Sequence, residues 1–433
     1  MRVNLKRCVI LILVILSSIL WVLFENEPQL DDDSTSIKDM RKGVSKFILR
    51  NSDKNPEMSQ VKIPIEKSPP VLLAGRMSVK CQDYLPTLRK RTQNIPITTN
   101  AHYNLFYCPM CKLASTYWTR FFKMLDMYND TSILSPYDIP ISIAKPTGER
   151  LQITVGTSGT PYDNYFKFMF VRDPYARILS AYVDKIFAPN PIYWEIWSKL
   201  LRKLKIDSRH TKTKCRSHFT FDEYIQSIIF NNKLHANFGT TDCHEASYVK
   251  TCHPCELKMN FVGKLEQFAT DSYFLYEKLN LSRAIETITK QGKQLADEDA
   301  LQDTVTSPFE WKDTIKSCIP WLEALKRIWR KLQVRGVIGK EELPLTAELA
   351  ENISVQEFIN LVLTTKEKTP YSERKKQRTE ALIEIYSSVK PELLEQLKHI
   401  YKHDFDFFEY DNNPSTIFNV SIKDIQYYGY LDT

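Results

Sequence analysis

A strand-like run that passes directly into a helix start constrains the fold of this chain more than any other feature. Tyr165 to Val171 is apolar, rich in β-forming residues and free of breakers. Asp173-Pro174 then supplies an N-cap residue followed by proline at the first helical position. The next apolar residues share one helical face, which predicts a helix to about Phe187. They are Ile178, Leu179, Tyr182 and Ile186.

Other segments repeat this order of strand and helix. We predict a strand from His102 to Tyr107 and a helix from Ala114 to Leu125. Phe261 to Gly263 has the pattern of a short strand, with helices expected on either side, at Phe221 to Ile229 and Asp271 to Leu279. Strands followed by helices predict an α/β core with a mainly parallel sheet flanked by helices. A strongly helical, charged segment covers residues from about 284 to 392.

The composition limits the kinds of site that such a fold can carry. Only 11 of the 433 residues are glycine, which excludes collagen-like and glycine-rich repeat architectures. The same scarcity argues against a nucleotide site cradled by a glycine-rich loop. The net charge of +7 permits an anionic partner without identifying one.

The N-terminus predicts a membrane anchor. Arg2, Lys6 and Arg7 precede an uncharged run from Cys8 to Phe24, and acidic residues follow it. As a helix this run would span roughly 25 Å, which suits the thin membranes of the early secretory pathway. The order of charges predicts a cytoplasmic N-terminus and a luminal body, as in a type II membrane protein. A cleaved signal peptide is the alternative, but bulky residues occupy its cleavage region.

These observations suggest a division of the chain into consecutive parts. We predict a cytoplasmic tail (residues 1–7), a transmembrane signal anchor (8–24), a luminal stem (25–100) and a globular domain (101–433) with a helical insertion at about 284–392. The stem is predicted because its residues are polar and show little sustained periodicity. Within it, a short apolar piece from Val71 to Ala74 is expected to pack on the globular domain.

Cysteines and glycosylation sequons also favour a luminal body. Eight cysteines remain outside the predicted anchor, an even number that predicts disulfides without specifying their pairing. Cys108-Pro109-Met110-Cys111 and Cys252-His253-Pro254-Cys255 are also compatible with two halves of a zinc site, although the gap between them is longer than in zinc ribbons. Four Asn-x-Ser/Thr sequons begin at Asn129, Asn280, Asn352 and Asn419.

The first strand-to-helix turn carries residues suited to an anion. Lys112 lies just before a helix that begins near Ser115 and Thr116. A helix N-terminus presents unpaired amides and a partial positive charge, so a lysine and hydroxyls there suit a phosphate or sulfate group. A solvated lysine is the plainer interpretation of the same residues.

The second turn carries a matching pair. Arg172 lies at the carboxyl end of its strand, where open α/β sheets bind ligands, and Ser180 lies about two turns into the following helix. A guanidinium and a hydroxyl that converge there suit a second phosphate. The alternative is that Arg172 pairs with Asp173 or Asp184 and that Ser180 only faces the sheet.

Together the two turns resemble those of the Golgi carbohydrate sulfotransferases, in particular the chondroitin, dermatan and GalNAc 4-O-sulfotransferases. Residues 108–120 are similar to that family's site for the 5′-phosphosulfate of the donor PAPS (3′-phosphoadenylyl sulfate), and residues 170–182 to its 3′-phosphate site. His244, the motif at 252–255 and the segments 261–266 and 401–410 follow in the family's order. The chain departs from the family at Cys111, Tyr117 and Glu245, where proline, asparagine and tryptophan are usual, and residues 284–392 have no counterpart.

The resemblance implies a P-loop-like sulfotransferase fold. It also implies that the protein is located in the Golgi membrane. It also implies in-line transfer of a sulfonyl group from PAPS to a sugar hydroxyl, with GalNAc 4-O of chondroitin or dermatan as the expected position and without a metal. Lys112 would stabilise the developing charge and His244 would be the base, with His102 and His235 as alternatives. The donor-binding residues implied are Lys112, Leu113, Ala114, Ser115, Thr116, Trp118, Arg172, Asp173 and Ser180.

A basic stretch between Lys199 and Arg216 predicts binding of an anionic glycan acceptor, with a solvated helix face as the alternative. The candidates are Lys199, Arg202, Lys203 and Lys205. We expect no nucleic acid partner. A kinase-like enzyme is disfavoured because no acidic metal-binding motif accompanies the turns. A non-catalytic luminal glycosaminoglycan-binding protein on the same fold is the alternative function.

Overall fold

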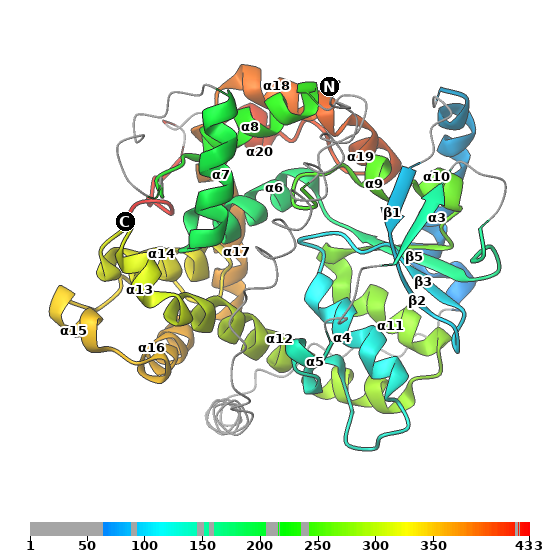
Figure 1. Ribbon diagram of the computed structural model, residues 1–433, viewed down its shortest axis with the longest axis horizontal. Coiled ribbons are helices and arrows are strands. Elements are labelled where there is room, and N and C mark those ends of the chain that lie inside the picture. The colour runs from blue at the N-terminus through cyan, green and yellow to red at the C-terminus, as the bar shows by residue number, and fades with distance from the viewer. Residues whose placement is uncertain are drawn as a thin grey trace, which may run out of the picture. The chain divides into compact units, whose positions relative to one another are not determined.

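The computed structural model contains a four-stranded sheet, drawn towards the right in Figure 1. The structure describes residues 64–87, 93–144, 151–155, 160–204, 215, 217–234, 242–420, 423 and 425–433. The strands are ordered β2 (Thr98–Asn100), β3 (Leu105–Tyr107), β5 (Phe166–Val171) and β6 (Phe261–Lys264). β3, β5 and β6 are mutually parallel and β2 is antiparallel to β3. The predicted α/β class and mainly parallel sheet are therefore confirmed, with the first strand shorter than expected because residues 101–104 form a turn.

Each parallel strand is followed by a helix. α4 (Ser115–Asp126) follows β3, α6 (Pro174–Tyr182) follows β5 and α11 (Phe268–Lys278) follows β6 after a short 3₁₀ turn. Asp173 is the N-cap of α6 and accepts a hydrogen bond from the Ala176 amide at 2.8 Å, as the sequence predicts. Beyond α6 the chain makes a π-helical turn, Val183–Phe187. Since parallel strands end at one edge of the sheet, the turns after β3 and β5 are neighbours.

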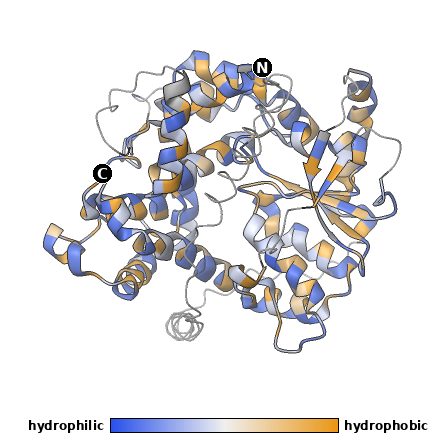
Figure 2. Cartoon of the chain, viewed as in Figure 1, coloured by the Kyte–Doolittle hydropathy of each residue, from blue (hydrophilic) through white to orange (hydrophobic). Residues whose placement is uncertain are grey.

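The core beneath the sheet is aromatic. Trp118 from α4 is fully buried, and its ring centroid lies 5.1 Å from that of Phe168 and 4.8 Å from that of Phe170 on β5. Figure 2 shows apolar residues along the strands and on one face of the surrounding helices. This packing holds the helix and strand ends that carry the site at a constant distance from each other.

A helix within the predicted stem belongs to the globular body. α3 (Pro69–Tyr84) packs on β6, with Leu73, Ala74 and Met77 buried, and the Cys81–Cys255 disulfide joins it to the helix after Cys252. The expectation for Val71 to Ala74 is confirmed, whereas the stem boundary at residue 100 is wrong. The polar composition concealed an apolar stripe at helical spacing, which needs a surface to cover it. β1 (Gln93–Pro96) also pairs with β4 (Gln152–Val155).

The segment predicted as a helical insertion is helical and packs on the core. Its helices are α12 (Ser282–Glu310), α13 (Lys312–Lys316), α14 (Trp321–Val334), α15 (Ala347–Asn352), α16 (Val355–Lys368) and α17 (Tyr371–Ser387), and α18 (Pro391–Ile400) begins at its end. α12 contacts α11 at one side and α14 and α16 at the other (Figure 1). α14 also contacts the π turn after α6, where Arg327 donates to the Phe187 carbonyl at 3.5 Å. The segment therefore reaches the region of the second turn.

The remaining helices complete the body around these elements. They are α5 (Ile141–Ala144), α7 (Pro191–Leu204), α8 (Phe221–Leu234), α9 (Tyr248–Cys252), α10 (Pro254–Leu257), α19 (Lys402–Phe407) and α20 (Ser415–Phe418). Asp404 of α19 is fully buried and accepts hydrogen bonds from the Ser247 hydroxyl and from the amides of Tyr248 and Val249. The C-terminal segment thus fixes the start of α9.

The eight cysteines outside the predicted anchor form four disulfides. The pairs are Cys81–Cys255, Cys108–Cys252, Cys111–Cys243 and Cys215–Cys318. Each cysteine of the two Cys-x-x-Cys motifs is bonded to a cysteine outside its own motif. This agrees with the disulfide interpretation, because a sulfur in a disulfide is not the thiolate that a zinc ion needs.

Among the described residues, none of the helices combines the length and the apolar character that a membrane span requires. The predicted tail and anchor, residues 1–24, lie outside the described residues, as does the stem up to residue 63.

Candidate active site

The loop between β3 and α4 has a backbone shaped for an anion. Lys112 and Ala114 adopt left-handed conformations with φ of 65° and 55°, which non-glycine residues rarely do. Ala114 is the N-cap of α4 and offers no side-chain cap, so the first amides of the helix have no intrahelical acceptor. The hydroxyls of Ser115 and Thr116 lie at the same helix start. The loop supplies amides, hydroxyls and a lysine without any glycine, which explains why no phosphate-loop motif is visible in the sequence.

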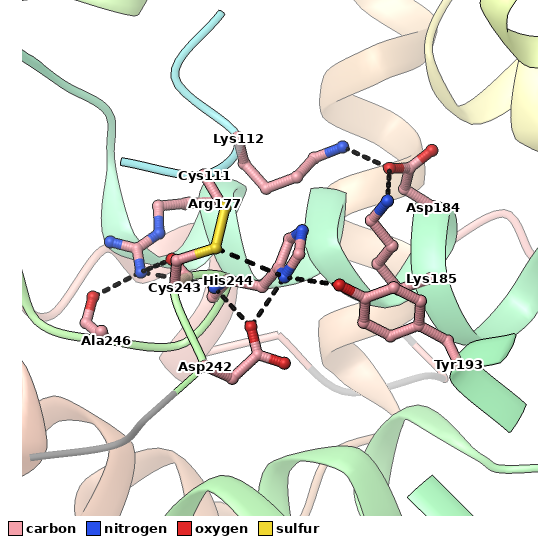
Figure 3. The surroundings of a disulfide bond; sticks show 10 residues. All are labelled: Cys111, Lys112, Arg177, Asp184, Lys185, Tyr193, Asp242, Cys243, His244 and Ala246. Atoms are coloured by element: carbon pink, nitrogen blue, oxygen red, sulfur yellow. Dashed lines mark hydrogen bonds and ion pairs between the residues drawn. A yellow bond between two sulfur atoms is a disulfide. The ribbon is translucent and has the colours of Figure 1, made fainter. Parts of the chain in front are cut away.

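Lys112 belongs to a cluster of three lysines around one carboxylate. Figure 3 draws two of these lysines, Lys112 and Lys185, together with Asp184. Its Nζ lies 2.8 Å from Asp184 Oδ2, Lys331 Nζ lies 2.5 Å from Asp184 Oδ1, and Lys185 Nζ lies 3.5 Å from Oδ2. Burial lowers the pKa of Lys112 to about 8, although Asp184 opposes the shift. Burial also disfavours the charge of Asp184, but the surrounding lysines hold its pKa well below the usual range. The cluster therefore carries a net positive charge that one carboxylate does not neutralise.

Arg172 follows β5 directly and keeps its guanidinium free. Its backbone amide donates to the Tyr248 hydroxyl at 3.2 Å, and that hydroxyl donates to its carbonyl at 2.9 Å. Among the described residues the guanidinium has no hydrogen-bond or ion-pair partner, because Asp173 caps α6 and Asp184 holds the lysines. Burial lowers the pKa of Arg172, so an anion beside it would restore its usual preference for the charged form. The half-buried Ser180 hydroxyl is likewise without a hydrogen-bond partner in the described part of the chain.

His244 is the predicted base that the structure brings to the lysine cluster. The residue is buried, and its Nδ1 lies 2.7 Å from Asp242 Oδ1 and 3.4 Å from the Tyr193 hydroxyl. A carboxylate on Nδ1 orients the ring and favours a free Nε2 that accepts protons. Figure 3 shows the second ring nitrogen on the side of the site where Lys112 lies.

The two alternative bases are not placed there. His102 is exposed and precedes β3, so it lies at the end of that strand opposite to Lys112. His235 lies outside the described residues.

A disulfide joins the candidate lysine to the candidate base. Cys111 and Cys243 are bonded, so Lys112 and His244 each lie one residue from the bridge (Figure 3). These two sulfurs and His244 form the only cluster among the described residues with metal-ligand spacing, but the bridge occupies both sulfurs. The bridge therefore holds the loop of Lys112 to the loop of His244.

Removing this bridge should impair catalysis as well as stability. The double variant Cys111→Ser with Cys243→Ser is expected to lose about 2–5 kcal/mol of unfolding free energy. It should also lose kcat, because the His244 loop is no longer held to the Lys112 loop. The double variant Cys215→Ser with Cys318→Ser removes a bridge away from these loops and should lose stability alone. Urea unfolding and kcat measurements on both variants test this, and an equal fall of kcat in the two would contradict the interpretation.

Three residues predicted to bind the donor have other roles. Trp118 is fully buried in the aromatic core, and Leu113 is also fully buried, so neither side chain is available to a ligand. Asp173 uses its carboxylate to cap α6, and burial raises its pKa to about 6. The side chains of these three residues therefore support the strand and helix ends, and a contact of their backbone with the donor stays a prediction. The similarity of a motif does not show which of its members face the ligand.

The predicted acceptor residues are only partly described. Lys199 on α7 is exposed and pairs with Glu195 one turn earlier at 2.6 Å. Lys205 and the side chains of Arg202 and Lys203 lie outside what the structure describes. Their role in acceptor binding stays a prediction.

Several residues of the site escaped the sequence analysis. Asp242 lies two residues before His244, a spacing that sequence inspection could have noticed. The sequence suggests Asp184 only as a partner of Arg172. No sequence pattern connects Lys331 with the site. It lies in the helical segment that has no counterpart in the resembling family, and it is more than 200 residues from Lys112 in the chain.

The profile described as "Sulfotransferase family" matches residues 96–330. The chain is 24% identical to carbohydrate sulfotransferase 14 of Danio rerio over 201 residues, which are 45% of this chain and 51% of the relative. It is 32% identical to carbohydrate sulfotransferase 10 of Rattus norvegicus over 128 residues, 28% of this chain and 34% of the relative.

A third relative matches a similar share. Carbohydrate sulfotransferase 8 of Homo sapiens is 31% identical over 126 residues, 29% of this chain and 28% of the relative. The chain thus spans about half or less of the length of the curated relatives it matches. No solved structure matches the chain.

Proposed function

Because the chain belongs to the sulfotransferase family of enzymes, we propose that it transfers a sulfonyl group from PAPS to a hydroxyl of a carbohydrate. The observation that carries the proposal is the pair of cationic turns at one edge of the sheet. Lys112 with the uncapped start of α4 forms one turn, and the unpartnered Arg172 with Ser180 forms the other. Their chemistry fits a donor with one anionic group at the 5′ position and another at the 3′ position of an adenosine.

The residues present fit such a donor through charge and through free hydrogen-bond donors. PAPS supplies the activated sulfonyl group. Lys112 and the first amides of α4 would stabilise the negative charge that develops on the oxygen of the broken S–O bond. Arg172 and Ser180 would hold the 3′-phosphate and so fix the position of the reacting end.

His244 would act on the acceptor. The acceptor oxygen forms a new bond to sulfur as the S–O bond to the donor phosphate breaks, and the hydroxyl proton passes to His244 Nε2. Asp242, on Nδ1, would stabilise the resulting imidazolium. The products are a sulfate ester and adenosine 3′,5′-bisphosphate, so atoms and charges balance without a further reactant.

For the acceptor we propose an anionic glycan, with GalNAc 4-O of chondroitin or dermatan as the first position to test. Support comes from the resemblance of the two turns and from the basic residues of the Lys199–Arg216 stretch. The relatives' names specify carbohydrate but not this hydroxyl.

We also propose that the chain is a Golgi type II membrane protein with a luminal body. Four disulfides favour an oxidising compartment. The asparagines of all four sequons are exposed, as glycosylation requires: Asn129, Asn280, Asn352 and Asn419. The charged and apolar pattern of residues 1–33 supports the predicted anchor.

The second turn gives the first test of donor binding. Wild-type protein is expected to bind adenosine 3′,5′-bisphosphate more tightly than adenosine 5′-monophosphate. Arg172→Ala should weaken the affinity for the bisphosphate by about 10–100-fold, because it removes a charge-assisted hydrogen bond. Ser180→Ala should weaken this affinity by a smaller factor. Neither variant should change affinity for the monophosphate much. Isothermal titration calorimetry on the purified full chain measures the affinity of the wild type and of both variants for each nucleotide, six values in all.

The control for this experiment is Lys376→Ala, which removes an exposed cation of α17. It should bind like the wild type. Transfer of label from ³⁵S-labelled PAPS to desulfated chondroitin, dermatan and heparan then separates an enzyme from a glycosaminoglycan-binding protein. A wild-type protein with no affinity for the bisphosphate and no label transfer would refute the proposed function.

A further inference from the structure

The end of α14 brings another cation towards the candidate active site. Lys331 on this helix shares Asp184 with Lys112, through contacts of 2.5 and 2.8 Å. Arg335 follows Lys331 by four residues, so its side chain leaves the same face of the helix one turn later. α14 therefore presents two successive cations on the side of the lysine cluster.

The backbone at Arg335 is firmly held. Arg374 is buried and donates to the Gly336 and Val337 carbonyls at 3.3 and 2.8 Å. Gln377 donates to the Gln333 carbonyl at 2.7 Å on the other side of Arg335. Gly336 has a φ of 63°, and a Cβ there would lie 2.4 Å from the Arg374 carbonyl oxygen, so the chain turns tightly at this point. Arg335 thus extends from a rigid support rather than from a loose loop.

The guanidinium of Arg335 has free N–H donors for a ligand. The residue is exposed, and its one hydrogen bond among the described residues goes from Nη1 to Thr304 Oγ1 at 2.7 Å. A guanidinium has five N–H donors, so most of them remain free. No carboxylate of the described residues pairs with it, while Lys112, Lys185 and Lys331 share Asp184 alone.

The charge of Arg335 reaches both turns. After burial, which is the larger cause, it contributes to the lowered pKa of Lys112 and to that of Arg172. Those two residues belong to different turns, after β3 and after β5. The charge of Arg335 is therefore within electrostatic reach of both turns.

We propose that α14 forms a third part of the donor site, beside the turns after β3 and β5. In this site Arg335 binds phosphate oxygens of the nucleotide, and Lys331 holds Asp184, the carboxylate that also contacts Lys112. The family profile ends at residue 330, so the comparisons assign neither residue. The inference rests on the proposed function, because it takes an adenosine bisphosphate as the ligand. It also gives the helical segment a role, which is to deliver positive charge to the reaction centre.

The test is the affinity of the purified full chain for adenosine 3′,5′-bisphosphate, measured by calorimetry. Arg335→Ala is expected to weaken binding by about 10–100-fold and Arg335→Lys by less, since lysine keeps the charge but not the planar fork. Lys326→Ala is the matched control: it removes an exposed cation from the same helix nine residues earlier, on the opposite face, and should bind normally.

Salt dependence separates a direct contact from a structural effect. If Arg335 binds phosphate, the affinity of Arg335→Ala should fall less steeply with added salt than that of the wild type, because one screened ion pair is gone. Thermal unfolding of each variant should stay close to that of the wild type. Wild-type affinity in Arg335→Ala, or a salt dependence identical to that of the wild type, overturns the inference. Failure of the wild type itself to bind the bisphosphate would instead refute the proposed function.

Discussion

Lys112→Ala is expected to lower kcat for sulfonyl transfer by about 10²–10³-fold, because it removes a preorganised cation from the point where negative charge develops. The effect on folding should be small. Asp184 keeps Lys331 at 2.5 Å and Lys185 at 3.5 Å, so its carboxylate does not become an unpaired buried charge. Steady-state transfer from labelled PAPS, together with thermal unfolding, measures both quantities. A kcat within threefold of the wild type would exclude Lys112 from the reaction.

Lys112 also predicts a pH dependence of donor binding. Its pKa of about 8 is low for a lysine because the side chain is buried. The charged form, which binds the anionic donor, therefore dominates at pH 7 and is lost as the pH rises through 8. Affinity for adenosine 3′,5′-bisphosphate should thus weaken between pH 7 and pH 9. Lys112→Arg keeps its charge over this range and should give a flatter profile.

His244→Ala is expected to have the second large effect, a loss of about 10²–10⁴-fold in kcat, because no other group would then accept the hydroxyl proton. Affinity for adenosine 3′,5′-bisphosphate should be unchanged, since the base acts on the acceptor. Asp242→Asn should lower kcat by a smaller factor because it weakens the orientation of the ring at Nδ1. The measurements are kcat over pH 5–9 and calorimetry with the bisphosphate.

His102→Ala is the matched control for this pair of variants. It removes an exposed histidine at the opposite end of β3 and should retain wild-type activity. If His102→Ala is inactive while His244→Ala is active, the assignment of the base is wrong.

Local patterns predicted the framework of the site because they depend on neighbouring residues. The apolar run before Asp173-Pro174 predicted β5 and the N-cap of α6, and the structure confirms both. A helix after Lys112 was likewise predicted from periodicity, and α4 begins at Ser115. Adjacent parallel strands then placed Lys112 and Arg172 at one edge of the sheet, as general topology requires.

Patterns were less informative where one residue has two possible uses. Trp118 and Asp173 belong to the motifs that resemble the donor site, yet one fills the core and the other caps a helix. A motif contains supporting and contacting residues side by side, and only the burial and the hydrogen bonds separate them. The stem boundary was wrong for a related reason: the apolar stripe of α3 is short, and its partner β6 lies more than 170 residues away in the chain.

The amino-acid sequence by itself determined the α/β class, the two turns that carry Lys112 and Arg172, and the even set of cysteines. Only the tertiary structure decided which cysteines pair, which carboxylate holds Lys112, and that α14 brings Lys331 and Arg335 to the same place. The physical reason is range. Periodicity and capping arise from interactions over a few residues, whereas ion pairs and disulfides depend on distances that packing sets between segments far apart in the chain.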